Sequence, residues 1–277
     1  MAVEHLIEHA AEQGGGIPEL PNVITLVGHG WHGLPVAAWL HRWENLVFSL
    51  IVASTLAVVC WRYARKPAVI PQGWQNLLEL LVEGIDRFVQ SILGPRGRRY
   101  TPFIGTLFLY IWLVNLSGLI PGMKSSTSNL NTTIGLAVVV FGYVQWIGIR
   151  SQGLFGYFDH LAGSPRDLVG WLLVPLMLPI HVLGEGIKPL SLSLRLGFNV
   201  FAEDVLLAVL VGLGITAGAA LHSPIGLPLQ LFVVPLVLIF STVQALVFSL
   251  LSTVYIALML PHGEHHSSDD ATRRTHA

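Results

Sequence analysis

Long apolar segments alternate with short polar ones along most of this chain of 277 residues. The apolar segments cover about 45–61, 101–121, 133–149, 168–219 and 229–260. A transmembrane helix needs roughly 17–25 consecutive apolar residues, and each of these segments reaches that length. The pattern predicts an all-α polytopic membrane protein, with about five membrane-crossing helices in a membrane domain over residues 42–260.

The fourth segment is too long for one helix that stands upright in a bilayer. It runs for about 50 residues, whereas a perpendicular crossing uses about 20. It also contains Pro175 and Pro179. We therefore expect a broken or strongly tilted helix, which forms a long tilted pair with the helix over 229–260.

Residues 74–93 follow a different pattern, in which apolar residues recur at helical spacing between charged ones. The apolar positions are Leu77, Leu78, Leu81, Ile85, Phe88 and Ile92, and the charged ones are Glu79, Glu83, Asp86 and Arg87. One apolar face and one charged face are typical of an amphipathic helix. We expect this helix to lie at the membrane interface or to dock on its neighbours.

The distribution of positive charge predicts the orientation. Residues 62–99 contain seven Lys and Arg residues and residues 262–277 contain two, whereas the segment before the first crossing contains only Arg42. Loops rich in Lys and Arg stay in the cytoplasm. We therefore expect a protein of the bacterial plasma (inner) membrane, with an extracytoplasmic N-terminal segment, residues 1–41, and a cytoplasmic C-terminal tail, residues 261–277.

The composition argues against several classes of function. Hydrophobic residues make up 53% of the chain and charged ones 11%. A net charge of −1 gives no reason to expect a nucleic-acid partner. Cys60 is the single cysteine, which leaves no disulfide framework and no Cys-x-x-Cys metal site. We expect neither a cofactor nor a bound metal.

The charges inside the apolar part concentrate around Arg195. Between Tyr100 and Leu260 the chain has ten Asp, Glu, Lys and Arg residues, and five of them lie in 185–204. A charge at the bilayer centre costs about 2.5–3.5 kcal/mol on insertion scales, so such residues usually face protein or water. At about 100° per residue, one stripe of a helix carries most of the polar groups. Its members are His181, Glu185, Lys188, Ser191, Arg195, Asn199 and Glu203, while Ser193 and Asp204 project nearly opposite.

Two explanations of this stripe are open. The first is an internal salt-bridge ladder, in which Glu203 and Arg195 are tied across two turns. The second is a water-accessible path for protons or ions in which Arg195 is a fixed positive charge, because arginine keeps its proton at any pH the membrane meets. The additional lysine, asparagine and histidine on the stripe favour the path.

The last predicted helix has a polar stripe of its own. Its members are Gln230, Ser241, Gln244, Ser252 and Tyr255. A polar stripe on a charge-free membrane helix is expected to face a polar partner, and the helix of Arg195 supplies one. Serine alone on such a helix is often only a packing residue. Asn115, in the second segment, either forms a hydrogen bond between helices or lines a channel.

Four motifs stand out in this chain: PLSLSLRLGFN (189–199), VQALVFSLLSTVYI (243–256), LYIWLVNLSGLIPG (109–122) and SNLNTT (128–133). Together they resemble the motifs of the a-subunit family of F-type ATP synthases. The resemblance covers nearly the whole chain. It implies a stator subunit held against a rotating ring of c subunits, with peripheral-stalk b subunits and the rest of the F1Fo complex as further partners in the lipid bilayer.

The same resemblance assigns roles to individual residues. Arg195 would be the essential arginine that meets each c-subunit carboxylate and separates two aqueous half-channels, so that proton flow is coupled to rotation. Asn199 and Gln244 match positions that line the arginine region. Asp204 matches a proton-relay position of the outer half-channel. Glu185 and Lys188 would lie toward the cytoplasmic exit.

The chain departs from the family pattern at two places. After Arg195 the order is Leu-Gly-Phe-Asn, whereas the family usually places the large residue before the small one. Family members often carry His or Glu seven residues before the glutamine, where this chain has Val237. We expect Glu203 to take over that relay role on the arginine helix, with support from Gln230.

Two other classes of function fit the sequence less well. A secondary transporter with its own substrate site usually shows internal repeats, and none is recognisable. A membrane-embedded enzyme needs a nucleophile–base pair or an HExxH motif, and neither is present. No P-loop occurs either, so we expect the chain not to be an enzyme on its own, with ATP chemistry on other subunits.

Overall fold

The computed structural model describes residues 43–65, 73–120, 123, 125–161, 168–220 and 228–260. The predicted N-terminal segment 1–41 and the predicted tail 261–277 lie outside the described residues.

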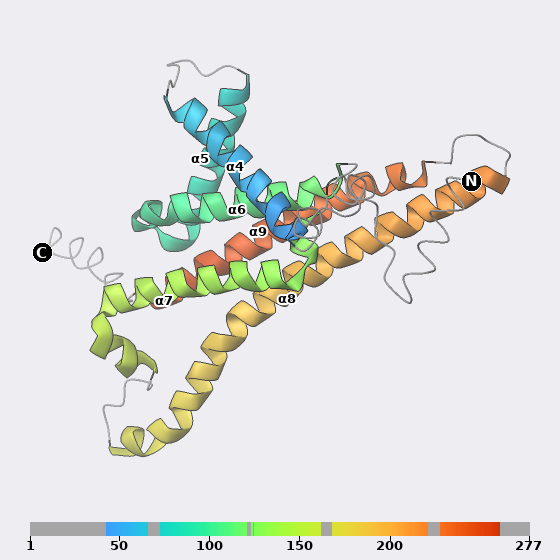
Figure 1. The fold of residues 1–277 in the computed structure, drawn as a ribbon. Coiled ribbons are helices and arrows are strands. Elements are labelled where there is room, and N and C mark those ends of the chain that lie inside the picture. The colour runs from blue at the N-terminus through green and yellow to red at the C-terminus, as the bar shows by residue number, and fades with distance from the viewer. Residues whose placement is uncertain are drawn as a thin grey trace, which may run out of the picture.

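The described ranges contain helices and no strand (Figure 1). They are α4 (Glu44–Arg65), α5 (Trp74–Leu93), α6 (Thr101–Ser117), α7 (Leu130–Leu161), α8 (Leu168–Ala220) and α9 (Val234–Met259), with the 3-10 segments η1 (Pro95–Tyr100), η2 (Ser126–Ser128) and η3 (Leu229–Phe232). Five stretches are long and apolar enough to cross a membrane, within α4, η1–α6, α7, α8 and α9. The prediction of an all-α polytopic membrane protein with five crossings is confirmed.

Several helix boundaries differ from the predicted ones for local reasons. The second crossing ends at Ser117 rather than at 121. The third extends to Leu161 but is kinked at Gly153, whose φ of 74° lies in the left-handed region that favours glycine. The last segment is two elements, because Pro235 lacks an N–H and is placed in the first turn of α9, after η3.

Helix α8 is continuous over 53 residues, so of the two expected forms, a broken or a strongly tilted helix, the structure lacks the break. At about 1.5 Å per residue its length is more than twice the ~30 Å hydrocarbon core, which requires a steep inclination or a bend. Figure 1 shows the helix bending in its first half, before a long straight second half. That first half contains Pro175, Pro179 and Pro189, and proline is the usual cause of a bend.

Helices α6, α7, α8 and α9 enclose the main apolar core. Its fully buried side chains include Ile104, Ile111, Val140, Leu196 and Phe248. Polar and aromatic contacts join the helices around it. Trp112 Nε1 of α6 donates a hydrogen bond of 2.9 Å to Thr242 Oγ1 of α9, and the rings of Phe103 and Tyr143 stack at 3.8 Å between α6 and α7.

The predicted amphipathic helix is α5, and its bounds match the predicted residues 74–93. Ile85 and Val89 are buried in the core cluster, while Glu83 and Arg87 form an exposed ion pair of 2.6 Å. Thr101 Oγ1 donates a 2.6 Å hydrogen bond to Asp86 Oδ1 and ties α5 to the beginning of α6. Of the two expectations, a helix at the membrane interface or one docked on its neighbours, the structure shows the docking.

A close approach of α7 and α8 explains the reversed order of Gly197 and Phe198. A Cβ atom on Gly197 would lie 2.7 Å from Leu130 Cδ2 and 3.1 Å from Thr133 Oγ1. Phe198, in contrast, is 55% exposed. A side chain at 197 would have to displace Leu130 and Thr133 of α7, whereas the large residue at 198 is exposed.

Replacing Gly197 with phenylalanine is expected to separate α7 from α8. Overpacking of this kind costs about 1–3 kcal/mol and often more for a ring. The matched control is Gly212→Phe on the same helix, since a Cβ there meets nothing within 4 Å. The amount of chain in the membrane and its thermal unfolding temperature are the measurements. Equal stability of the two variants would contradict the close approach.

Candidate functional site

Helix α8 has one exposed face and one buried face over its second half. The exposed residues that share one side of the helix are Ser191, Arg195, Phe198, Ala202, Leu206, Val209, Leu213 and Thr216. At about 100° per residue they lie within a sector of roughly 80°, and the exposed Asn199 borders it. The buried residues, on the other side, include Leu192, Leu196, Val200 and Leu207. The exposed face is therefore a mostly apolar strip that contains a single cation, and we call it the arginine face.

Arg195 forms neither an ion pair nor a hydrogen bond with another residue of the described ranges. The carboxylate of Glu203 instead accepts a 3.2 Å hydrogen bond from Ser241 Oγ of α9. The internal salt-bridge ladder between Glu203 and Arg195, one of the two explanations of the stripe, is thus not formed.

The polar stripes of α8 and α9 meet next to the arginine face. Asn199 Nδ2 donates a hydrogen bond of 2.8 Å to Gln244 Oε1. Gln244 is 5% exposed, and its Nε2 atom is buried without a hydrogen-bond partner. Together with the contact between Ser241 and Glu203, this pairing joins the two helices through side chains that the sequence places on separate segments.

Glu185 and Lys188 form an ion pair about two to three turns before the arginine. The ammonium group of Lys188 lies 5.5 Å from the ring centre of Tyr255 on α9. These three residues, with Val140 and Pro189, line a small cavity of about 10 Å³. That volume is close to the minimum for one water molecule. The structure therefore brings Glu185, Lys188 and Tyr255 together between α7, α8 and α9.

Asp204 faces a different neighbour from Glu203. A Cβ atom on Gly118 would lie 3.5 Å from Asp204 Oδ1 and 3.0 Å from Ser125 Cβ. Asp204 is thus directed to the end of α6 and the segment before η2, as its position opposite the stripe predicts. Two adjacent carboxylates serve two separate polar environments, since consecutive helix residues point about 100° apart.

The environment of Asp204 is a buried group of hydroxyls and amides, which we call the η2 polar cluster. It consists of Asn115, Ser117, Ser125, Ser126 and Thr127. Thr127 Oγ1 donates a 2.7 Å hydrogen bond to Asn115 Oδ1, and the hydroxyls of Ser125 and Thr127 lie 2.8 Å apart. Asn115 Nδ2 is buried without a partner. A buried amide that is left unpaired is unusual and marks room for a further polar group.

The first turn of α4 extends this cluster, which the sequence did not reveal. Ser126 Oγ donates a 2.6 Å hydrogen bond to the carbonyl oxygen of Asn45, and Asn45 Oδ1 is buried without a partner. Glu44 is only 6% exposed. In the sequence, the signal available for this contact was a carboxylate at the beginning of an apolar helix together with a loop rich in Ser and Thr. Its burial depends on η2 packing against α4, which no local pattern encodes.

The remaining predicted residues lie apart from these contacts. His181 is exposed and its Nδ1 atom donates a 3.0 Å hydrogen bond to the Met177 carbonyl of its own helix. Ser252 is buried and bonds the Phe248 carbonyl of its own helix, as a packing residue does. Val237 is buried and apolar. Gln230 belongs to η3, but its side chain lies outside the described parts of the structure.

Comparison with known proteins identifies the family. Residues 46–257 match the family described as ATP synthase A chain. The ATP synthase subunit a of Protochlamydia amoebophila is 45% identical over 88% of this chain and 90% of its own length. The subunits a of Solidesulfovibrio magneticus (37% identical, 80% of this chain, 84% of the relative) and of a Sulfurihydrogenibium species (34%, 80% and 99%) are also similar. The chain is a multi-pass membrane protein and belongs to the ATP synthase A chain family.

Proposed function

We propose that this chain is the proton-translocating stator subunit of an F-type ATP synthase. In this proposal the arginine face contacts a ring of c subunits, and Arg195 meets each c-subunit carboxylate in turn. Two aqueous half-channels, offset from each other, lead to and from that contact. Protons reach the ring from one side of the membrane and leave on the other after nearly a full turn, so that proton flow drives rotation.

The observation that carries the proposal is an unpaired arginine on an exposed helix face that is mostly apolar and holds no other charge. Lipid is a poor neighbour for that face, because a charge inside the bilayer costs several kcal/mol. A partner that is itself mostly apolar but supplies an intermittent carboxylate satisfies both the apolar side chains and the guanidinium. Arginine keeps its proton, so it attracts the carboxylate and repels other cations without carrying protons itself.

The η2 polar cluster supports an entrance on one side of the arginine. It extends from the Asn45 carbonyl in the first turn of α4, next to the buried Glu44, to Asp204 on α8 by way of buried hydroxyls, and Asn115 Nδ2 and Asn45 Oδ1 are unpaired. Water molecules that bridge such atoms conduct protons readily. We assign this route to the outer half-channel, with Asn115 as a lining residue and Asp204 as the relay group nearest the ring.

Glu203 supports a second relay position beside the arginine. It lies on the α9 side of α8 and accepts a hydrogen bond from Ser241, one turn of α9 from Val237. The carboxylate thus occupies the side of the helix pair where many relatives are expected to carry an ionisable residue on α9. Asn199 and Gln244 hold the two helices together at the level between Arg195 and Glu203.

The inner half-channel is assigned to the opposite end of the polar stripe. Glu185, Lys188 and Tyr255 surround a cavity of about 10 Å³ there, and Ser191 lies on the exposed face between them and the arginine. The excess of Lys and Arg in 62–99 supports an orientation with this end in the cytoplasm and the N-terminus outside, in a bacterial plasma membrane. The b subunits of a peripheral stalk would hold the chain against rotation.

Replacement of Arg195 by alanine is expected to abolish ATP-driven acidification of inverted membrane vesicles, with a fall of at least ~10-fold. Assembly of the complex is checked by co-purification. Passive proton leak is expected to rise, because the charge that separates the half-channels is gone. Arg150→Ala is the matched control, since Arg150 is an exposed arginine of α7 away from the arginine face. Normal pumping by an assembled Arg195→Ala complex would refute the rotary role.

Separate replacement of Glu203 and Asp204 tests the two relay positions. Glu203→Gln keeps an acceptor for Ser241 but cannot carry a proton, and Asp204→Asn does the same beside the η2 polar cluster. Each variant is expected to slow ATP-driven pumping about 10-fold, and the double variant to abolish it. Ser241→Ala, which removes only the hydrogen bond, should have the smallest effect. Wild-type pumping by Glu203→Gln would remove Glu203 from the relay.

A further inference from the structure

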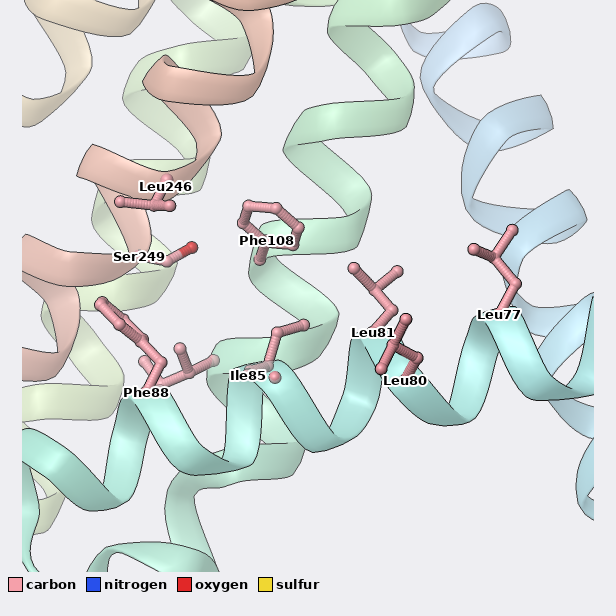
Figure 2. Close-up of a pocket in the computed structure, with 10 residues that line it drawn as sticks. Leu77, Leu80, Leu81, Ile85, Phe88, Phe108, Leu246 and Ser249 are labelled. Carbon is pink, nitrogen blue, oxygen red and sulfur yellow. The ribbon is translucent and has the colours of Figure 1, made fainter.

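A cavity of about 300 Å³ lies between α5, α6 and α9, away from the arginine face (Figure 2). Its walls include Leu81, Ile85 and Phe88 of α5, Phe108 of α6, and Leu246 and Ser249 of α9. Apart from Ser249, the side chains that line it are apolar. The volume is about ten times the ~30 Å³ that one water molecule occupies in the liquid, but apolar walls of this kind do not hold water. The cavity therefore suits an apolar occupant of substantial size.

Ser249 adds one polar contact to this apolar space. The residue is 2% exposed and its Oγ atom has no hydrogen-bond partner. Its neighbours Ser252 and Thr253 both bond carbonyl groups of their own helix at 2.8 Å. Figure 2 shows Ser249 Oγ directed into the space between Phe88, Ile85 and Phe108. A buried hydroxyl without a partner is costly, so the occupant is expected to accept one hydrogen bond.

The open side of the cavity carries apolar residues that remain exposed. Leu77 and Leu80 of α5 are 53% and 65% exposed, and Leu246 of α9 is 45% exposed. In a protein with five crossings, apolar side chains of this kind contact lipid rather than water. An occupant that comes from the bilayer can enter past these residues without crossing a polar layer.

The level of the cavity along α6 is close to a cluster of positive charge. Ile104, which lines it, lies one turn from the beginning of α6, and η1 precedes that beginning with Arg98 and Arg99. Both arginines are exposed, and the side chain of Arg98 is 81% exposed. A cavity just inside a basic rim is complementary to a lipid with an anionic headgroup.

We propose that the cavity binds one acyl chain of an anionic phospholipid. The chain fills the apolar space, Ser249 Oγ donates a hydrogen bond to an ester carbonyl, and the phosphate lies at the level of the η1 arginines. A bound lipid of this kind stabilises the packing of the amphipathic helix α5 against α6 and α9. The inference depends on the membrane fold alone and is independent of the proposed route for protons.

The experiment uses the whole purified complex in nanodiscs with trace amounts of a diazirine-tagged lipid. Phosphatidylglycerol and phosphatidylcholine with the same tagged acyl chain are compared, and labelled peptides are located by mass spectrometry. In the wild type, label is expected on peptides from 74–93, 101–117 and 243–250, with phosphatidylglycerol labelling them several-fold more than phosphatidylcholine. Labelling of the exposed Val138 and Val139 on α7 measures random contact with lipid.

Two variants test the cavity itself. Gly84 lines it, and a Cβ there meets nothing within 4 Å, so Gly84→Leu places a side chain in the open space and should remove most of the label. Gly142→Leu on α7, also with nothing within 4 Å, is the matched control and should leave labelling unchanged. Ser249→Ala keeps the volume but removes the donor, and labelling should fall ~2–10-fold.

Four results would overturn the proposal. Labelling of the cavity peptides no stronger than that of Val138 and Val139 would mean that no lipid is held. Unchanged labelling in both Gly84→Leu and Ser249→Ala would place the lipid elsewhere. Cross-links from a cysteine at Leu80 to another subunit, with no lipid label, would show that a partner helix fills the space. Equal labelling by the two lipids would refute the anionic headgroup.

Discussion

The charge of Arg195 is the constraint on which the arrangement of this protein depends. A guanidinium cannot lose its proton, and the apolar side chains around it cannot satisfy its charge. In the proposed function, a carboxylate of the partner provides that negative charge. The helices behind it are organised accordingly. Leu192, Leu196 and Val200 anchor the back of α8 in the core and leave the arginine on the outer side. Gly197 lets α7 approach closely and keeps that helix in position.

The polar groups around the arginine divide into two sets because of helix geometry. Neighbouring residues of a helix point about 100° apart, so Glu203 and Asp204 face different helices although they are adjacent in the chain. Glu203 joins the seam between α8 and α9, whereas Asp204 joins the η2 polar cluster. A pair of acids on one turn can therefore serve a route on each side of the helix. The swapped order of Gly197 and Phe198 follows from the same geometry.

Helix α5 differs from the membrane-crossing helices because it has one charged, exposed face and one apolar, packed face. Its charged face remains in contact with water, and its apolar face packs on α6 through Ile85 and Val89. Packing between three helices that meet at different angles leaves the space in front of Ser249 unfilled by protein. In a membrane such a space is accessible to lipid, and a helix held partly by lipid can support the core without taking part in proton movement.

Three features could be predicted from the sequence alone: the number of crossings, the amphipathic helix and the polar stripe of α8. These features depend on local periodicity and on the fixed thickness of a bilayer, and both can be read from neighbouring residues. Only the tertiary structure shows the partners of Glu203 and Asp204, the burial of Glu44 and the cavity at Ser249. Each depends on segments far apart in the chain, so only the packed helices show which polar groups meet and which space stays open.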